Sequence, residues 1–276
     1  MTTKQEFHIS VNSSDQTAVD LIANASELSR QKIKQAMQKG CVWLENHKTS
    51  HIQRIRRAKK ILSKDDVVHF YYNPNVLNTE PPVASLISDE ADYSIWNKPA
   101  GMFSQGSKWG DHCTIYRWAE KHLKPERPAF IVHRLDRAAS GLIILAHTKQ
   151  IAAQFSQLFE QRNIEKTYHV TVTGDFSKSM TDKSNLKTLN GEIDAKKAIS
   201  HVRLLEYNTE TNESTLEVQI ETGRKHQIRK HLSELSFPVV GDRLYGSSNI
   251  EKDLQLKAVL LRFKSPIDGK SKSYCL

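Results

Sequence analysis

The chain has 276 residues and a formal net charge of +9 at pH 7, because 40 Lys and Arg residues outnumber 31 Asp and Glu residues. This length suffices for one large domain and a smaller module, and the positive charge predicts salt-sensitive attraction to polyanions such as nucleic acids. Residues 1–16 lack an apolar signal segment, and no run approaches the roughly 18 apolar residues that span a bilayer, so we expect a cytoplasmic protein without membrane contact.

The side chains that most often bind metals are sparse and poorly spaced. Cys41, Cys113 and Cys275 are odd in number and far apart, which argues against a disulfide framework and against a zinc site built from close cysteine pairs. His226 and His231 would be the best metal ligands, but their five-residue spacing on a helix puts them on different faces. The chain has neither a P-loop nor a dinucleotide fingerprint. These patterns argue against a metal site and against a nucleotide-binding site.

The first predicted helix lies in a short basic segment at the N-terminus. Ser29 precedes Ile33 and Met37, which are four residues apart, and Gly40 follows. This pattern predicts a capped amphipathic helix that ends at the glycine. Alternating apolar residues predict strands over 41–44 and 67–70.

A proline-rich segment divides the chain. Asn-Pro and Pro-Pro dipeptides occur between residues 73 and 82, and proline neither continues a helix nor donates to a sheet. The predicted organisation is a first domain over 1–72, a linker over 73–86 and a larger domain over 87–276.

The larger domain shows alternating strand patterns and one helical stripe. Tyr168 should share an apolar strand face with Val170 and Val172. A second alternation runs through the strand that ends near Ile220, and helical spacing follows from Ile228. Arg229 should flank that helical stripe, where an arginine ordinarily extends to water.

The most informative segment is 133–141, HRLDRAASG, which precedes the apolar run 142–146. Asp136 lies there between Arg134 and Arg137, and nearby positive charge favours the ionised form of a carboxylate. An ionised carboxylate is a possible covalent nucleophile. The alternative is that Asp136 only binds the backbone of its own loop, as aspartates in loops often do.

This segment resembles the HRLDxxTSG signature of the RluA-type pseudouridine synthases. Four further segments resemble motifs of that family and occur in the family's order along the chain. They are NKPAG at 97–101, KTY at 166–168, TGRKHQIR at 222–229 and GDRLYG at 241–246. The resemblance covers residues from about 87 to 263. Five motifs make chance an unsatisfactory explanation.

The resemblance implies a fold, a reaction and four site residues. The fold would be α+β, with a central antiparallel or mixed sheet and flanking helices that form an RNA cleft. The reaction would isomerise uridine in RNA to pseudouridine without a cofactor. Asp136 would be the catalytic carboxylate, Tyr168 would line the uridine pocket and Arg229 would pair with Asp136. Arg134 would enter the space left by the flipped base, and its alternative is a simple phosphate contact.

The N-terminal segment resembles an S4-type RNA-binding module, a small α/β unit. Its helix near 29–40 and its turn and strand near 63–67 carry the resemblance, although Asp65 stands where glycine is usual. The candidate RNA contacts of the whole chain are basic. They are Arg30, Lys34, Arg54, Arg57, Arg134, Arg137, Lys166 and Arg224. The alternative for the N-terminal charges is an ordinary solvated face.

Departures from the family pattern and the choice of target leave alternatives open. Ala139 replaces the usual Thr, Lys225 a small residue and Lys257 a His, and the polar stretch 174–197 is shorter than in many relatives. An S4-like module on this catalytic type favours large-subunit rRNA over tRNA. A single set of motifs would allow a monomer. The alternatives are a tRNA pseudouridine synthase, a noncatalytic RNA-binding or ribosome-assembly factor and, last, a glycosidase, which needs two carboxylates.

Overall fold

The computed structural model describes residues 3–180, 185–246 and 252–276. The chain folds into two compact units, one made of 1–81 with 105–118 and one of 82–104 with 119–276. We call them the N-terminal unit and the catalytic-motif unit. The predicted larger domain, 87–276, included residues 105–118, which belong to the N-terminal unit in the structure. None of the helices in the described ranges is long and apolar enough to cross a membrane.

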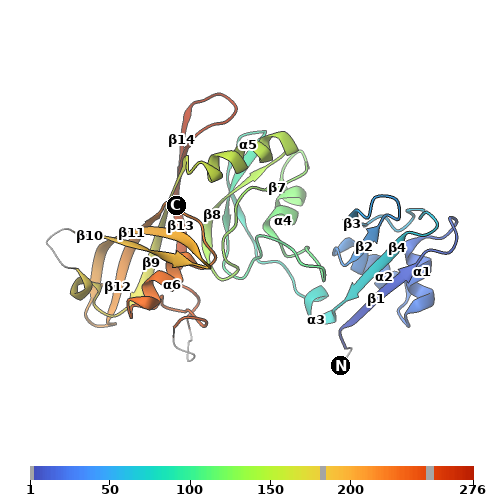
Figure 1. Ribbon diagram of the computed structural model, residues 1–276, viewed down its shortest axis with the longest axis horizontal. Coiled ribbons are helices and arrows are strands. Elements are labelled where there is room, and N and C mark those ends of the chain that lie inside the picture. Colours follow the sequence, from blue (N-terminus) through green and yellow to red (C-terminus); the bar gives the residue numbers. More distant parts are fainter. Residues whose placement is uncertain (1–2, 181–184, 247–251) are drawn as a thin grey trace. The chain divides into compact units, whose positions relative to one another are not determined.

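The N-terminal unit contains a four-stranded antiparallel sheet with helices on one face. The strand order is β1 (Gln5–Ser10), β4 (Val67–Tyr72), β2 (Val42–Glu45) and β3 (Ile52–Arg54). The helices are α1 (Ala18–Ala25), α2 (Arg30–Gln38) and the short α3 (Pro74–Leu77). Helices α1 and α2 lie beside the sheet (Figure 1), and their apolar residues form one core with those of β2 and β4.

The helix cap and the turn predicted for this unit have the conformations that their motifs favour. Ser29 caps α2, because its side chain accepts a hydrogen bond from the Lys32 amide, and Ile33 and Met37 are buried. The helix prediction is confirmed. Asp65 has φ 71°, in the left-handed region that favours glycine. This explains why glycine is usual at that position of the motif.

The catalytic-motif unit is built around one long mixed sheet. In the described residues the strand order is β10, β11, β12, β9, β13, β8, β6, β5, with β14 beside β13 and β7 beside β8. The pairing of β13 with β8 is parallel, and the other pairings are antiparallel. The strand bounds are β5 Ser85–Asp89, β6 Tyr93–Lys98, β7 Phe130–Ile131, β8 Ser140–Ala146, β9 Ile164–Thr173, β10 Leu186–Ile193, β11 Lys196–Asn208, β12 Glu213–Ile220, β13 Leu256–Lys264 and β14 Ser271–Cys275.

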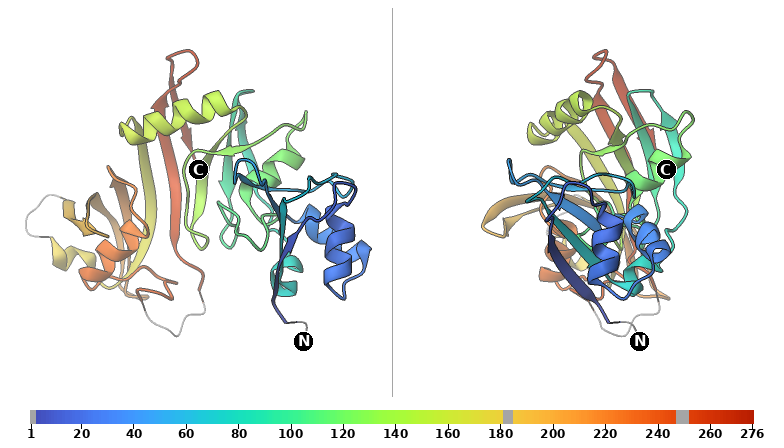
Figure 2. Two further views of the ribbon diagram at one scale, coloured as in Figure 1. Left: turned by 45° about the vertical axis from the view of Figure 1, so that its right-hand side comes forward. Right: turned by 90° about the vertical axis from the view of Figure 1, so that its right-hand side faces the viewer.

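Helices cover separate parts of this sheet (Figure 2). Helix α5 (Lys149–Glu160) buries Phe155 against residues of β6, β8 and β13, and α6 (Gln227–Glu234) lies beside β10 and β11. The remaining helices are α4 (Ile115–His122) and the 3-10 turn η1 (Phe176–Ser179). Much of the polar stretch 174–197 forms η1, β10 and the turn to β11, while 181–184 lie outside the described residues. The α+β prediction with a central mixed sheet is confirmed.

Candidate active site

The loop that carries Asp136 joins β7 to β8, and a serine side chain holds its backbone. Ser104 donates its hydroxyl to the Leu135 carbonyl at 2.7 Å and accepts the Leu135 amide at 3.1 Å. Gly141, at the start of β8, has φ 110°, and a Cβ there would lie 2.2 Å from the Ala258 carbonyl oxygen of the parallel strand β13. The motif therefore needs glycine for both its conformation and its close strand approach.

Arg229 links two carboxylates at the beginning of α6. Its Nε and one terminal nitrogen each lie 2.7 Å from an oxygen of Asp242, and its Nη1 lies 3.1 Å from Oδ2 of Asp136. The Arg229 and Asp242 side chains are buried, whereas the Asp136 side chain is 25% exposed. The bidentate pair fixes the guanidinium plane and leaves one nitrogen for the exposed carboxylate. Arg229 is thus buried and does not extend to water.

The electrostatics of this cluster favour charged groups. Burial alone would raise the pKa of Asp242, but hydrogen bonds from Arg229 and from the Leu244 and Tyr245 amides hold that pKa below its ordinary value. Burial opposes the charge of Arg229 too, yet its contacts with Asp242 and Asp136 raise its pKa. The guanidinium therefore stays positive beside Asp136.

Tyr168 lies on the buried face of β9, as its alternation with Val170 and Val172 predicted. Burial raises the pKa of its phenol, and the negative charge of Asp136 raises it further. The phenol is therefore protonated at neutral pH and can act as a hydrogen-bond donor or as an aromatic surface. The pKa of this hydroxyl therefore depends on the charge of Asp136.

Lys98 belongs to the NKPAG motif, and its place in the sequence predicted no function for it. Its side chain is completely buried, and its amine donates to the carbonyls of Ala139 at 2.6 Å, Met102 and Pro99 at 3.0 Å, and Arg137 at 3.4 Å. Burial lowers the pKa of Lys98 to about 7, and Asp136 opposes this decrease. The lysine ties the 98–102 turn to the part of the loop that follows Asp136. A lysine before proline at the end of an apolar strand was the available signal.

His226 lies near Asp136, and Tyr245 lies beside His226; neither residue was assigned a function at this site from the sequence. The His226 Nε2 atom lies 3.8 Å from Oδ1 of Asp136, and its Nδ1 atom lies 2.9 Å from the Tyr245 hydroxyl. Both belong to motifs already recognised, TGRKHQIR and GDRLYG. Only the fold brings these two motifs together at Asp136.

The predicted RNA contacts of this unit differ in exposure. Arg134 and Arg137 are exposed in the same loop as Asp136, and Arg137 donates to the Gly101 carbonyl and lies over the Phe103 ring. Arg224 is partly buried, and its Nε donates to the Lys197 carbonyl at 3.0 Å. Lys166 is partly buried beside the Phe159 ring, and burial lowers its pKa. The two loop arginines are therefore the most accessible of the four cations.

The predicted contacts of the N-terminal unit also separate into two kinds. Arg30, Lys34 and Arg57 are exposed, and Arg30 pairs with Asp20 at 3.0 Å. Arg54 instead donates its Nε to the Gly40 carbonyl at 2.9 Å and lies over the Trp43 ring. Its guanidinium has interactions within its own unit, so it is less available to RNA than the other three.

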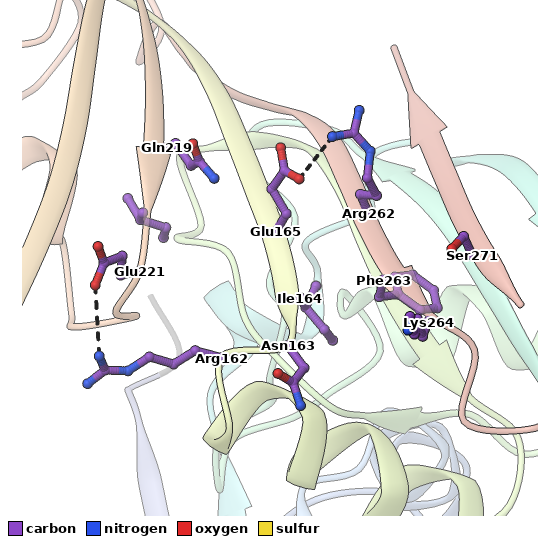
Figure 3. A pocket seen from close by; sticks show the side chains of 11 residues that line it. Arg162, Asn163, Ile164, Glu165, Gln219, Glu221, Arg262, Phe263, Lys264 and Ser271 are labelled. Carbon is purple, nitrogen blue, oxygen red and sulfur yellow. Dashed lines mark hydrogen bonds and ion pairs between the residues drawn. The ribbon is translucent and has the colours of Figure 1, made fainter. Parts of the chain in front are cut away.

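A groove of about 520 Å³ lies along β9, β12 and β13, away from these motif residues (Figure 3). Glu165 pairs at 2.9 Å with Arg262, its neighbour on the adjacent strand, and Arg162 approaches Glu221 at 3.9 Å. Glu165 alternates with Tyr168 along β9 and points to the other face. These two pairs involve four of the charged side chains that line the groove. No group of three or more candidate metal ligands occurs among the described residues.

Comparison with known proteins identifies the family. A family model described as RNA pseudouridylate synthase matches residues 92–234, which include Asp136, Tyr168 and Arg229. The chain belongs to this family. The synthase thus has the enzyme activity that its motifs predicted, the isomerisation of uridine in RNA, and it is of the RluA type.

Relatives of the synthase include enzymes named for two different RNAs. The tRNA pseudouridine synthase C of Vibrio parahaemolyticus is 32% identical over 217 residues, covering 69% of the synthase and 88% of that relative. The ribosomal large subunit pseudouridine synthase D of Haemophilus influenzae is 27% identical over 286 residues, covering 93% and 84%. The structure of human RNA pseudouridylate synthase domain containing 1 has a TM-score of 0.58 at 21% identity, covering 72% of the synthase and 86% of that chain. This last likeness shows the shared fold.

Proposed function

We propose that Asp136 is the catalytic carboxylate of this RNA pseudouridine synthase. The observation that carries the proposal is the arrangement around Arg229: buried Asp242 fixes the guanidinium, and the guanidinium contacts the partly exposed carboxylate of Asp136. Such a contact orients the carboxylate. An oriented, accessible carboxylate can act on the nucleotide.

The reaction is balanced within one substrate. The bond between uracil N1 and ribose C1′ breaks, the uracil turns in its pocket, and a bond forms between C5 and C1′. The proton on C5 is lost and N1 gains one, so neither an oxidant nor a co-substrate is needed. Tyr168 lines the uracil pocket, where an aromatic ring can stack on a base for about 1–3 kcal/mol. Arg134 occupies the space that the flipped base leaves.

The N-terminal unit acts as an S4-type RNA-binding module, and large-subunit rRNA is the target. Exposed Arg30, Lys34 and Arg57 support the first part, because exposed basic side chains bind phosphates. The relative named for large-subunit rRNA supports the second part, because its similarity extends over more of this chain than that of the relative named for tRNA. A tRNA target is the alternative. The synthase works in the cytoplasm, where these RNAs occur.

The test is pseudouridine mapping of total RNA by carbodiimide treatment and sequencing. We compare cells with the wild-type gene, a deletion, Asp136→Asn and a matched control, Asp92→Asn. Asp92 is an exposed aspartate of the same unit outside the motifs. We expect the same pseudouridines, in 23S-type rRNA, to disappear from the deletion and from Asp136→Asn and to remain with Asp92→Asn.

Three other outcomes would contradict parts of the proposal. Lost sites in tRNA would reverse the target assignment. Sites that are absent from the deletion but retained by Asp136→Asn would refute the assignment of the catalytic carboxylate. An unchanged map in the deletion, with RNA binding intact in vitro, would favour a noncatalytic RNA-binding factor.

A further inference from the structure

His226 stands in an unusual backbone conformation between Asp136 and Tyr245. Its φ is 56°, in the left-handed region, and it immediately precedes the first residue of α6. Its ring is 16% exposed and lies edge-on to the Tyr245 ring, with the centroids 5.6 Å apart. Its side chain does not cap the helix. A non-glycine residue at this φ without a capping function suggests that the side chain is needed elsewhere.

The two oxygens of Asp136 face different groups. Oδ2 accepts from Arg229 at 3.1 Å, and Oδ1 faces the His226 Nε2 atom at 3.8 Å. A carboxylate held at one oxygen can still turn about its terminal torsion, which is broad for aspartate. A donor at the second oxygen would fix the carboxylate plane.

The Tyr245 hydroxyl determines what His226 can offer. Its oxygen lies 2.9 Å from Nδ1. When the hydroxyl donates to Nδ1 of a neutral imidazole, the ring proton lies on Nε2, which points at Asp136. The distance of 3.8 Å exceeds a hydrogen bond, but such contacts in ligand-free sites are often long and shorten when substrate binds.

We propose that His226, oriented by Tyr245, is a positioning residue that donates Nε2–H to Oδ1 of Asp136 in the RNA complex and so fixes the carboxylate plane. The proposal rests on the catalytic function proposed for Asp136. It adds a second donor on the side of the carboxylate opposite Arg229.

The charges around His226 are consistent with a neutral ring. Burial lowers the pKa of His226; the carboxylates of Asp136 and Asp242 oppose this decrease, and the cations Arg229 and Lys225 reinforce it. The ring is therefore neutral at neutral pH and above, and the hydroxyl of Tyr245 is the group that can hold its proton on Nε2.

Two substitutions separate positioning from a purely structural function. Asparagine accepts the left-handed conformation more readily than glutamine, but its amide ends near the position of Nδ1. Glutamine strains the backbone, but its amide nitrogen can reach the position of Nε2. A structural function therefore predicts that His226→Asn is better than His226→Gln in both stability and rate. Positioning predicts the reverse order for the rate alone.

The experiment uses purified full-length protein and total RNA from the deletion strain, which retains the unmodified sites. Single-turnover rates at saturating RNA, RNA affinities and melting temperatures are measured for wild type, His226→Asn, His226→Gln, Tyr245→Phe and Asp136→Asn. We expect His226→Asn to lower the rate about 100-fold and His226→Gln about 10-fold, with RNA affinity unchanged, because small misplacements cost this much. Tyr245→Phe should also lower the rate.

The outcomes separate this inference from the proposed function. If Asp136→Asn reacts like the wild type, the proposed function fails whatever the His226 variants do. If Asp136→Asn is inactive and the rates of the His226 variants follow their melting temperatures, or Asn is as fast as Gln, the positioning function is refuted. A rate with Gln above that with Asn, together with a lower melting temperature for Gln, supports it.

Discussion

Two buried aspartates, one in each unit, bind arginines in different ways. Asp111 of the N-terminal unit lies 2.5 Å from Arg56 and 3.4 Å from Arg54, and it accepts the Tyr116 hydroxyl at 2.5 Å. Asp242 of the catalytic-motif unit binds Arg229 through two nitrogens at 2.7 Å. Both carboxylates are almost inaccessible to water.

The difference lies in the direction of the remaining donors. Arg54 and Arg56 direct their other nitrogens to backbone carbonyls of Gly40, Ser107 and Gln38. That cluster is closed, and it ties residues 105–118 to the strands of the N-terminal unit. Arg229 instead directs its third nitrogen to a partly exposed carboxylate. The same kind of buried pair thus stabilises structure in one unit and presents a reactive group in the other.

Breaking the open cluster should have the largest effect. Asp242→Asn leaves the Arg229 guanidinium buried with one weakened partner, which costs about 3–5 kcal/mol for a buried pair. It should also lower the single-turnover rate on the order of 100-fold, because Arg229 is no longer fixed beside Asp136. Chemical unfolding and single-turnover assays measure the two effects. A stable variant with a normal rate would show that Arg229 needs no anchor.

The pH dependence of stability gives an independent readout of Asp242. Because its pKa is lower in the folded than in the unfolded state, its stabilising contribution is complete above the unfolded value of about 3.8 and is lost as pH falls below it. As the pH falls below about 4, the free energy of unfolding should therefore decrease less for Asp242→Asn than for the wild type. Asp253→Asn, which changes an exposed aspartate of the same unit, is the matched control.

Breaking the closed cluster should affect folding without the chemical step. Asp111→Asn leaves Arg54 and Arg56 without their carboxylate, and we expect a loss of about 3 kcal/mol, confined to the N-terminal unit. Hydrogen exchange of the β2 and β3 amides should increase, while the single-turnover rate at saturating RNA stays within about threefold of wild type. A rate loss as large as that of Asp242→Asn would remove the distinction between the clusters.

Lys98 sharpens the comparison, because its buried amine is surrounded by carbonyls and not by a carboxylate. Lys98→Met keeps most of the side-chain volume but leaves those carbonyls without a donor, at a cost of about 1–3 kcal/mol. We expect a lower melting temperature and a moderate decrease in rate, since the Asp136 loop loses its tie to the 98–102 turn. An unchanged melting temperature would mean that water replaces the amine.

The sequence could predict local features and motif contacts, but not the anchors. Periodicity was sufficient for β9 and for the start of α6, and the family resemblance implied the contact between Arg229 and Asp136, which are 93 positions apart. It gave no sign that Asp111 would capture Arg56, 55 positions away, because charge runs look alike whether solvated or buried. His226 could be recognised as part of the TGRKHQIR motif. Its contact with Tyr245 could not be predicted, because Tyr245 belongs to a different motif, GDRLYG.

The smallest change in stability is expected for glycine substitutions at two residues with a left-handed backbone conformation. These are Asp65 in the N-terminal unit and His226 in the catalytic-motif unit. Asp65→Gly relieves the side-chain clash of that conformation but makes the unfolded chain more flexible, so the free energy of unfolding should change by less than about 1 kcal/mol. Activity should be unchanged. His226→Gly should be similarly stable but slow, because it removes the donor to Asp136. Melting curves and single-turnover rates for both variants test this. If His226→Gly reacted as fast as Asp65→Gly, the conformation of His226 would serve only the start of α6.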